Sequence, residues 1–474
     1  MYRTLLKNAT IVTVDRALGT LEDCDLLIEG ERIAEIRPGI EAADADVIDA
    51  SQMIVMPGLI NAHVHAWETV LRGTGADWQG DEYFEVVLGK LGAHFTPDDI
   101  YLSTLLGAYA QIDSGCTTMF EWLHASNTPD HSDMCIKALE DAGIRAIFGH
   151  GTPKPEPLPG QPHFSDIPHP EAEIKRLCEG RFAANGDGLV SLAMCILGPD
   201  YAGIEVNRTD FALAREYGLK TSAHVWGGEG RKVPGGYKTI IEEGLLDPGH
   251  MPVHANFFDL DEVKLLVDHG ASFIATPVAE LGVPKPPLIS HVIRAGGHPS
   301  IAVDSEIDVS GSMFDAMRSA RQLQSAFDAM EAYDPEMKYE KKGRPDIDVA
   351  VTAHDVTCSS MDVLEWATIN NARALGLDSK TGSLVPGKQA DIVMLRKTDL
   401  NLAPVTDPVQ SIVTHAHAGN VDTVFVNGRM MKRHGRLLTD LAGLTSKSDR
   451  TAHRFLDLAE QLGRPLRTHV QTPG

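Results

Sequence analysis

Apolar and polar positions near both ends of the chain follow the pattern of short β-strands. The runs are rich in β-branched residues and are separated by polar turns, and one of them contains Asn427-Gly428, a hairpin-turn dipeptide. They lie at residues 9–14, 24–30, 32–38, 391–397 and 423–431. Since these two β-rich ends flank a long middle, we expect them to pair into one small β-sandwich domain, made of residues 1–56 and 381–440. Residues 441–474 are expected to form a C-terminal helical tail.

The middle of the chain alternates short apolar runs with helical segments. The runs are bounded by Gly, Pro or Asp, which is typical of strands buried on both faces. They lie at residues 53–63, 116–122, 145–151, 190–197, 220–225, 251–257, 271–277 and 300–306. The segment 96–115 begins with Thr-Pro and acidic residues, and 261–270 ends in Gly, as helices do. Eight strands that alternate with helices predict an α/β fold, a (β/α)8 TIM barrel, over residues 57–380.

Two segments are longer than the strand–helix repeat of a barrel requires. The segment 66–95 carries several aromatic residues, and the segment 310–350 is rich in charged ones. Both follow the carboxyl ends of predicted strands, where barrel enzymes place their loops over the site. We therefore expect a lid or a pocket wall from each.

Composition and charge narrow the class of protein. The 474 residues are 43% hydrophobic and 23% charged, as in an ordinary globular protein, and the net charge of −24 disfavours binding to nucleic acid or to anionic membranes. The six cysteines are scattered, without a CxxC pair, and no run approaches the roughly 18 apolar residues of a membrane span. We expect a cytoplasmic protein with a small-molecule substrate and without a nucleic-acid or membrane partner.

Five side chains that can bind metal lie at the ends of predicted strands. His63 and His65 are two residues apart, so an extended strand points both imidazoles to the same side. His224, His254 and Asp304 end the fifth, sixth and eighth strands. Because the carboxyl ends of barrel strands meet at one mouth, these groups predict a site for a first-row divalent metal.

At these residues the chain resembles the amidohydrolase superfamily, in its mononuclear, cytosine deaminase- and chlorohydrolase-like branch. The resemblance includes PGLINAHVH (57–65), LRG (71–73) and the segment 367–395. It implies that His63, His65, His224 and Asp304 hold one metal ion, with zinc most expected and iron, manganese or cobalt possible. The predicted fourth strand has no lysine to bridge two metals, which favours a single ion. Members of this family are often homodimers or homotetramers.

The resemblance also implies the roles of the catalytic residues. Asp304 would take the proton of a metal-activated water and pass it to the leaving group, and His254 would polarise the substrate oxygen. The reaction is then hydrolysis at a trigonal carbon. Cleavage of an amide-like bond and deamination of a ring both fit this chemistry.

Residues near the predicted mouth favour one of the two reactions. Ring deaminases of this branch commonly carry a Glu three residues after the strand-5 His, where this chain has Gly227. A looser resemblance to phenylurea and thiocarbamate hydrolases supports cleavage of an amide, urea or carbamate C–N bond in a small, mostly apolar molecule. The alternative is a hydrolytic deaminase of an N-heterocycle that releases ammonia. The expected substrate contacts are Trp67, Trp122, His150 and Glu280.

Overall fold

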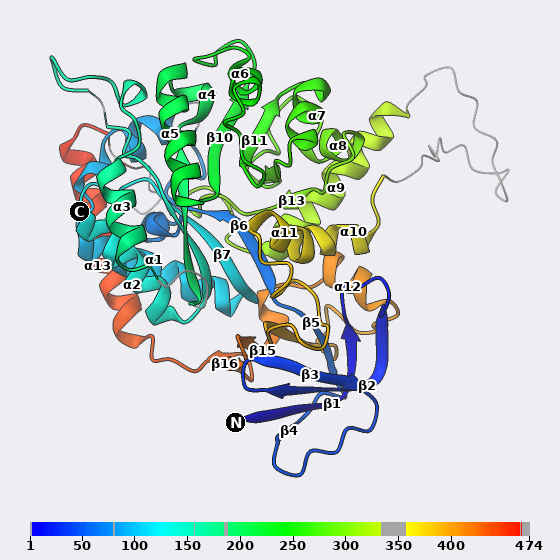
Figure 1. Cartoon of the computed structure of the whole chain (residues 1–474). Helices are drawn as coiled ribbons and strands as arrows, with labels where there is room; N and C mark the ends of the chain where they lie inside the picture. Colours follow the sequence, from blue (N-terminus) through cyan, green and yellow to red (C-terminus); the bar gives the residue numbers. More distant parts are fainter. Residues whose placement is uncertain are drawn as a thin grey trace, which may run out of the picture.

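The computed structural model describes residues 2–78, 81–155, 157–183, 188–332, 357–464 and 466. Figure 1 shows a large body of strands and helices with a smaller sheet at its lower edge, where the N-terminus lies. The predicted α/β barrel and the additional sheet domain are both confirmed.

The barrel is an eight-stranded parallel sheet in which consecutive strands are neighbours. The last two strands are short because only two residues of each are regularly paired. The strands are β6 (Leu59–Val64), β7 (Cys116–Leu123), β8 (Arg145–His150), β9 (Val190–Ile196), β10 (Thr221–Gly227), β11 (Met251–Phe257), β12 (Ile274–Ala275) and β13 (Ser300–Ile301).

The barrel closes between its first and last strands at the candidate metal-binding residues themselves. Val64 pairs with Asp304 in a parallel bridge. The backbone N–H of His65 donates to the Asp304 carbonyl at 3.2 Å, and the Asp304 N–H donates to the His63 carbonyl at 3.2 Å. The same backbone bonds that close the sheet therefore bring His63, His65 and Asp304 together.

Helices follow most strands and cover the outside of the barrel (Figure 1). The helix predicted at 96–115 forms as α1, where Thr96 and Asp99 make a reciprocal capping box. The α-helices are α1 (Pro97–Asp113), α2 (Pro129–Ala142), α3 (Glu171–Glu179), α4 (Gly198–Tyr201), α5 (Ile204–Tyr217), α6 (Gly236–Glu242), α7 (Leu260–Asp268), α8 (Leu288–Arg294), α9 (Met313–Glu331), α10 (Ser360–Glu365), α11 (Asn371–Leu375), α12 (Pro408–Thr414) and α13 (Ala442–Gln461). Short 3-10 or π turns are η1 (Ala66–Leu71), η2 (Phe84–Leu88), η3 (Leu91–His94), η4 (Phe164–Asp166), η5 (Trp366–Asn370) and η6 (Ala418–Asn420).

The two β-rich ends form one nine-stranded sheet with its own apolar core. Strand β5 joins the ends, since it pairs with β1 on one side and with β14 on the other. The strands are β1 (Arg3–Val12), β2 (Thr20–Glu29), β3 (Arg32–Arg37), β4 (Asp46–Asp49), β5 (Met53–Pro57), β14 (Ile392–Arg396), β15 (Val421–Val426), β16 (Arg429–Arg433) and β17 (Arg436–Leu437).

The run predicted as one strand over 53–63 is two strands in different sheets. Strand β5 belongs to the small sheet and β6 to the barrel, and the chain changes direction at Gly58. A Cβ atom at Gly58 would lie 2.0 Å from the Thr117 hydroxyl oxygen, so only glycine fits this crossing. Because both halves are apolar, the hydrophobic pattern does not show the break.

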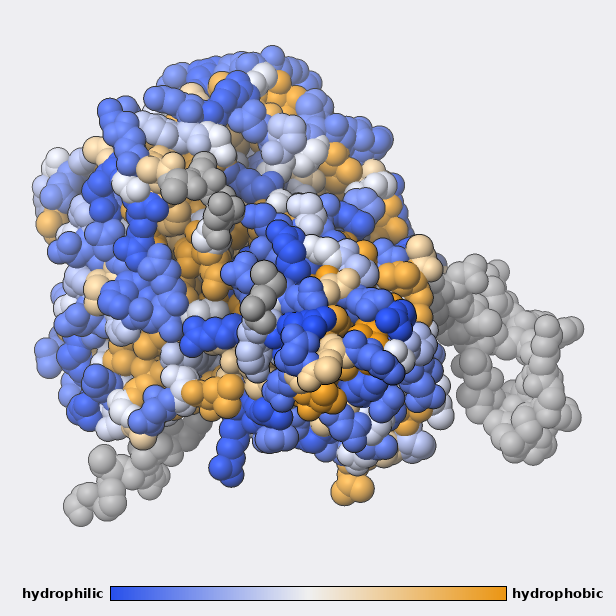
Figure 2. Space-filling view, turned by 60° about the horizontal axis from the view of Figure 1, so that its bottom comes forward, coloured by the Kyte–Doolittle hydropathy of each residue, from blue (hydrophilic) through white to orange (hydrophobic). Residues whose placement is uncertain are grey.

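The small sheet contacts the amino-terminal ends of the barrel strands. Arg145, which begins β8, makes a buried ion pair with Asp391 at 2.8 Å, and Lys432 pairs with Asp113 at 2.8 Å. The carboxyl ends of the strands, where the candidate site lies, are therefore left free. The face in Figure 2 is mostly hydrophilic, with scattered apolar patches. Within the described ranges, no helix has the length and apolar character to cross a membrane.

Candidate active site

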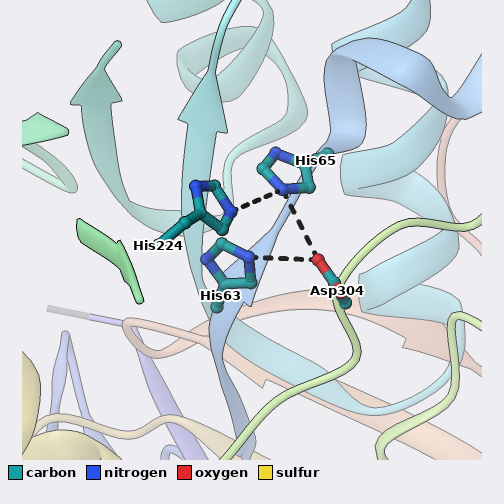
Figure 3. Close-up of side chains that lie close together, drawn as sticks. All are labelled: His63, His65, His224 and Asp304. Carbon is teal, nitrogen blue, oxygen red and sulfur yellow. Dashed lines mark hydrogen bonds and ion pairs between the residues drawn. The ribbon is translucent and has the colours of Figure 1, made fainter. Parts of the chain in front are cut away.

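Four side chains bring their donor atoms to one point at the mouth of the barrel (Figure 3). One ligand atom from each of His63, His65, His224 and Asp304 lies within 4.8 Å of the others. The His63 Nε2 atom is 3.1 Å and the His65 Nε2 atom 3.5 Å from the Asp304 Oδ1 atom. The Nε2 atoms of His224 and His65 are 3.3 Å apart. The predicted grouping of these four residues is thus present in the structure.

This spacing matches the demands of a divalent metal. With metal–nitrogen bonds of about 2.0–2.1 Å, the edges of a ligand tetrahedron are about 3.3 Å long. Three of the donor separations are 3.1, 3.3 and 3.5 Å, close to that value, and all of them lie within 4.8 Å. Three imidazoles and one carboxylate are also a donor set that first-row divalent ions accept. The residues present therefore fit a mononuclear site.

A backbone carbonyl of β7 orients the His65 side chain, and a buried carboxylate holds the backbone that follows His65. The Trp122 carbonyl can only accept, so the His65 Nδ1 atom donates to it at 3.0 Å and Nε2 is left with a lone pair for a ligand. The buried Glu121 carboxylate accepts from the N–H groups of Ala66 and Trp67 at 2.7 and 2.9 Å. These bonds turn the chain out of the strand directly after His65.

His254 lies beside the four donors and is held by Thr276 and Glu280. Its Nδ1 atom is 3.0 Å from the Thr276 hydroxyl and 3.3 Å from the Glu280 Oε1 atom, and its Nε2 atom is 3.8 Å from the Asp304 Oδ2 atom. Both His254 and Asp304 have left-handed backbones, with φ of 73° and 85°. Such conformations cost about 1–3 kcal/mol for residues with a side chain and are concentrated at functional sites.

The electrostatics of the site favour an ionised Asp304 and neutral imidazoles at His63, His65 and His224, whereas the pKa of the neighbouring His254 is raised. Burial alone would raise the pKa of Asp304, but His254 and His63 lower it below its ordinary value. Burial lowers the pKa of His65 to about 3. Burial opposes the charged form of His254 as well, yet Asp304 and Glu280 raise its pKa. Neutral imidazoles and an ionised carboxylate are the forms that bind metal.

A cavity of about 190 Å³ opens over these residues. One part of its wall is apolar, and another part carries the carboxylates of Glu280, Asp304 and Asp308. Tyr83, Phe84 and Leu88 confirm that the segment 66–95 supplies pocket wall. The apolar lining consists of Phe84, Leu88, Val225, Trp226, Ala279 and Val283. From the segment 310–350, helix α9 contributes none of the cavity lining, and 333–350 lie outside the described residues.

Three of the four predicted substrate contacts lie behind the cavity wall. Trp67 has no exposed surface and packs on Phe95, with ring centroids 5.0 Å apart. Trp122 is buried and its ring centroid lies 3.9 Å from that of His224. His150 is buried against His169, with 2.9 Å between ring nitrogens. Glu280 alone of the four lines the cavity.

The sequence analysis did not predict several residues that line the cavity. His124, directly after β7, and Lys154, four residues after β8, both line the cavity. Alternation along β7 would have indicated His124, because it lies two residues after Trp122 and their rings stack 5.8 Å apart. Tyr83 is held by the fully buried Glu68, to which its hydroxyl donates at 2.8 Å.

Comparison with known sequences confirms the resemblance to amidohydrolases. The profile of the amidohydrolase family matches residues 54–431. The chain is 27% identical to 5'-deoxyadenosine deaminase of Methanothermobacter thermautotrophicus over 88% of this chain and 91% of that one. It is 27% identical to 5-methylthioadenosine/S-adenosylhomocysteine deaminase of Symbiobacterium thermophilum, over 91% and 94% of the two chains. These relatives support the ring-deaminase alternative better than cleavage of an amide.

Among solved structures, the fold is similar to that of an adenosine deaminase from Xanthomonas campestris with bound zinc. The TM-score is 0.77 with 19% sequence identity, over 95% of this chain and 98% of that one. This likeness supports the barrel architecture with its additional sheet.

Proposed function

Because the chain belongs to the amidohydrolase family, we propose that this hydrolase of C–N bonds is a deaminase of an N-heterocycle. It would replace a ring amino group by oxygen and release ammonia. The observation that carries the proposal is the group of His63, His65, His224 and Asp304 at the floor of a cavity with aromatic and carboxylate walls. A bound divalent ion, with zinc the first candidate, supplies a water that ionises near pH 7. The deaminase relatives decide between the two reactions that the sequence leaves open.

Gly227, which speaks against deamination in the sequence, has a structural reason to be glycine. Its φ is 87°, and a Cβ atom would lie 2.6 Å from the Phe258 ring and 2.9 Å from its backbone nitrogen. Its N–H donates to the buried Asp200 carboxylate at 2.7 Å. A glutamate therefore does not fit at this position, and the proton for the ring nitrogen must come from another acid.

Glu280 is the better placed of two candidate acids in the cavity wall. It is 7% exposed and accepts from the Thr276 N–H at 2.9 Å, whereas Asp308 lies at an exposed position. A carboxyl group in the cavity wall can deliver a proton to a substrate nitrogen within hydrogen-bond distance. In our proposal Glu280 takes this role, Asp304 accepts the proton of the attacking water, and His254 orients the oxygen that adds to the ring.

The apolar mouth favours a planar substrate with a further apolar part. Phe84 and Trp226 line the cavity and remain 45% and 46% exposed, although their rings contact Tyr83 and Phe257. Aromatic faces bind planar heterocycles by stacking. The relatives are named for 6-aminopurine nucleosides modified at the 5' position. We therefore propose an aminopurine nucleoside of this class as substrate.

An ammonia assay separates the proposed reaction from its rival. The zinc-loaded full chain is incubated with 5'-deoxyadenosine, 5-methylthioadenosine and S-adenosylhomocysteine, and in parallel with anilides and phenylureas. We expect ammonia from at least one nucleoside, and no aniline. His63→Ala serves as the metal-deficient control and must abolish the signal. Release of aniline without ammonia from any heterocycle would establish amide-type cleavage instead.

A further inference from the structure

His124 is a buried imidazole without a hydrogen-bond partner beside the proposed metal site. It is 3% exposed, and neither of its ring nitrogens has a partner among the described residues. Its ring lies 5.2 Å from that of His224 at an angle of 15°, and 4.7 Å from that of His65. An unsatisfied buried polar group costs about 1–3 kcal/mol, so it is rare in a finished fold. Because His124 also lines the cavity, a bound molecule is the natural partner of this ring.

Lys154 also lines the cavity, and it has no ionic partner among the described residues. Its Nζ atom is 4.9 Å from the centre of the Tyr201 ring, and no carboxylate in the described part of the chain pairs with it. Both Lys154 and His124 also border a small void of about 10 Å³ next to the main cavity. The side chains of His124 and Lys154 therefore face the same space.

We propose that His124 and Lys154 form a subsite that binds an oxygen acceptor carried by the aminopurine substrate, either a carbonyl on its ring or a carboxylate on its 5' substituent. This inference rests on the proposed function and names the substrate feature that the cavity selects. A lysine has three donors and no acceptor, and a neutral imidazole has one N–H donor.

The position of the subsite agrees with the rest of the cavity. His124 and Lys154 follow β7 and β8, whereas Glu280 and Asp304 follow β12 and β13. The hydrogen-bond donors thus follow one pair of neighbouring strands, and the carboxylates follow another pair. A heterocycle whose reacting amino group faces Asp304 and Glu280 presents its acceptor atoms to His124 and Lys154.

Two matched pairs of ligands distinguish the sources of the oxygen. Adenine against 2-hydroxyadenine tests a ring carbonyl, and 5'-deoxyadenosine against adenosine-5'-carboxylate tests a carboxylate. Binding to the zinc-loaded full chain is measured by calorimetry, which needs no turnover. We expect the oxygen-bearing member of one pair to bind at least about tenfold more tightly, since hydrogen bonds to a charged group contribute 1.5–3 kcal/mol. Equal binding within both pairs would overturn the subsite.

Variants assign the preference to the two residues. Lys154→Met and His124→Phe, which keeps a ring of similar size, should each reduce the preference to about twofold or less, with zinc content unchanged by elemental analysis. Lys264→Met, on the exposed surface of α7, is the matched control and should keep it. A full preference in folded Lys154→Met would refute the proposal even if His124→Phe did not fold. Ammonia release without a preference refutes only the subsite, and a preference without ammonia release refutes only the deaminase reaction.

Discussion

The Glu280 carboxylate lies 3.3 Å from the Nδ1 atom of His254 and accepts from the Thr276 hydroxyl at 3.0 Å. This contact connects β11 to the loop after β12 and fixes the ring that faces Asp304. Glu280 is thus both a cavity residue and the acceptor that orients His254.

Glu280→Gln should lower kcat by about 10–100-fold, the usual cost of losing a group that orients an active-site histidine. The amide can neither protonate the ring nitrogen nor attract the His254 N–H as a carboxylate does. Steady-state kinetics with the best nucleoside, together with zinc analysis, check this expectation. Glu229→Gln is the control because Glu229 is exposed, and it should leave kcat unchanged. Equal, small effects of both substitutions would remove Glu280 from the reaction.

Asp304→Asn should lower kcat by about 10²–10⁴-fold, the range for loss of a general base, while the protein stays folded. The fold is expected to survive because Asp304 closes the barrel through its backbone N–H and carbonyl, which the substitution keeps. Circular dichroism and kinetics give the two readouts. Asp261→Asn on α7 is the surface control. Substantial turnover by Asp304→Asn would show that another group accepts the proton.

Removal of the metal should abolish activity and lower the melting temperature, since four donors converge on one point. Dialysis against a chelator, followed by addition of zinc, should reverse both effects. His63→Ala should reduce zinc content by about tenfold or more at limiting zinc. His453→Ala, at an exposed position of α13, should bind zinc normally. Full zinc content in His63→Ala would contradict the ligand assignment.

Gly227→Glu should destabilise the protein rather than restore a proton donor. The left-handed backbone and the contact with Phe258 together cost about 2–5 kcal/mol. Urea unfolding measures the loss of free energy. Gly230→Glu is the matched control, because nothing lies within 4 Å of a Cβ atom there. A stable, faster Gly227→Glu enzyme would show that the loop can rearrange to accept the acid.

Asp210 should make stability fall as the pH rises toward neutrality. It is 2% exposed and accepts from the His169 N–H at 2.8 Å, and burial raises its pKa from 3.8 to about 7. Between these values the folded protein binds a proton that the unfolded chain has lost, so unfolding becomes easier with increasing pH. Asp210→Asn should flatten this dependence between about pH 4 and 7 in thermal melts. If the pH dependence of stability is unchanged in Asp210→Asn, another titrating group causes it.

The grouping of the four candidate metal ligands could be predicted from the sequence because it depends on two regular rules. Side chains two residues apart on a strand share a face, and parallel strands of a barrel end at one mouth. His63 and His65 obey the first rule, and all four residues, with His224 and Asp304, obey the second. Trp67 does not obey the first rule, since the chain leaves the strand after His65 and enters η1, so the alternation ends and the indole turns into the core.

These two rules do not predict which loop residues line the cavity. Lys154 lies in the loop after β8, where no periodic pattern fixes the direction of a side chain. Gly227 was interpreted by comparison with other deaminases, but its reason is local, in the close approach of Phe258. The boundary at Gly58 was hidden because the residues on both sides are equally apolar.

The pairing of β5 with β14 has a consequence for the growing polypeptide on the ribosome. Strand β5 is made early, but its partner β14 begins only at Ile392. At about 5–20 residues per second, β5 emerges on the order of 20 to 70 s before β14 and exposes an apolar edge during that time. All the barrel strands are therefore synthesised while the small sheet still lacks β14. We expect chains that stop before residue 391 to aggregate or to be held by chaperones, which a stalled-ribosome binding assay would detect.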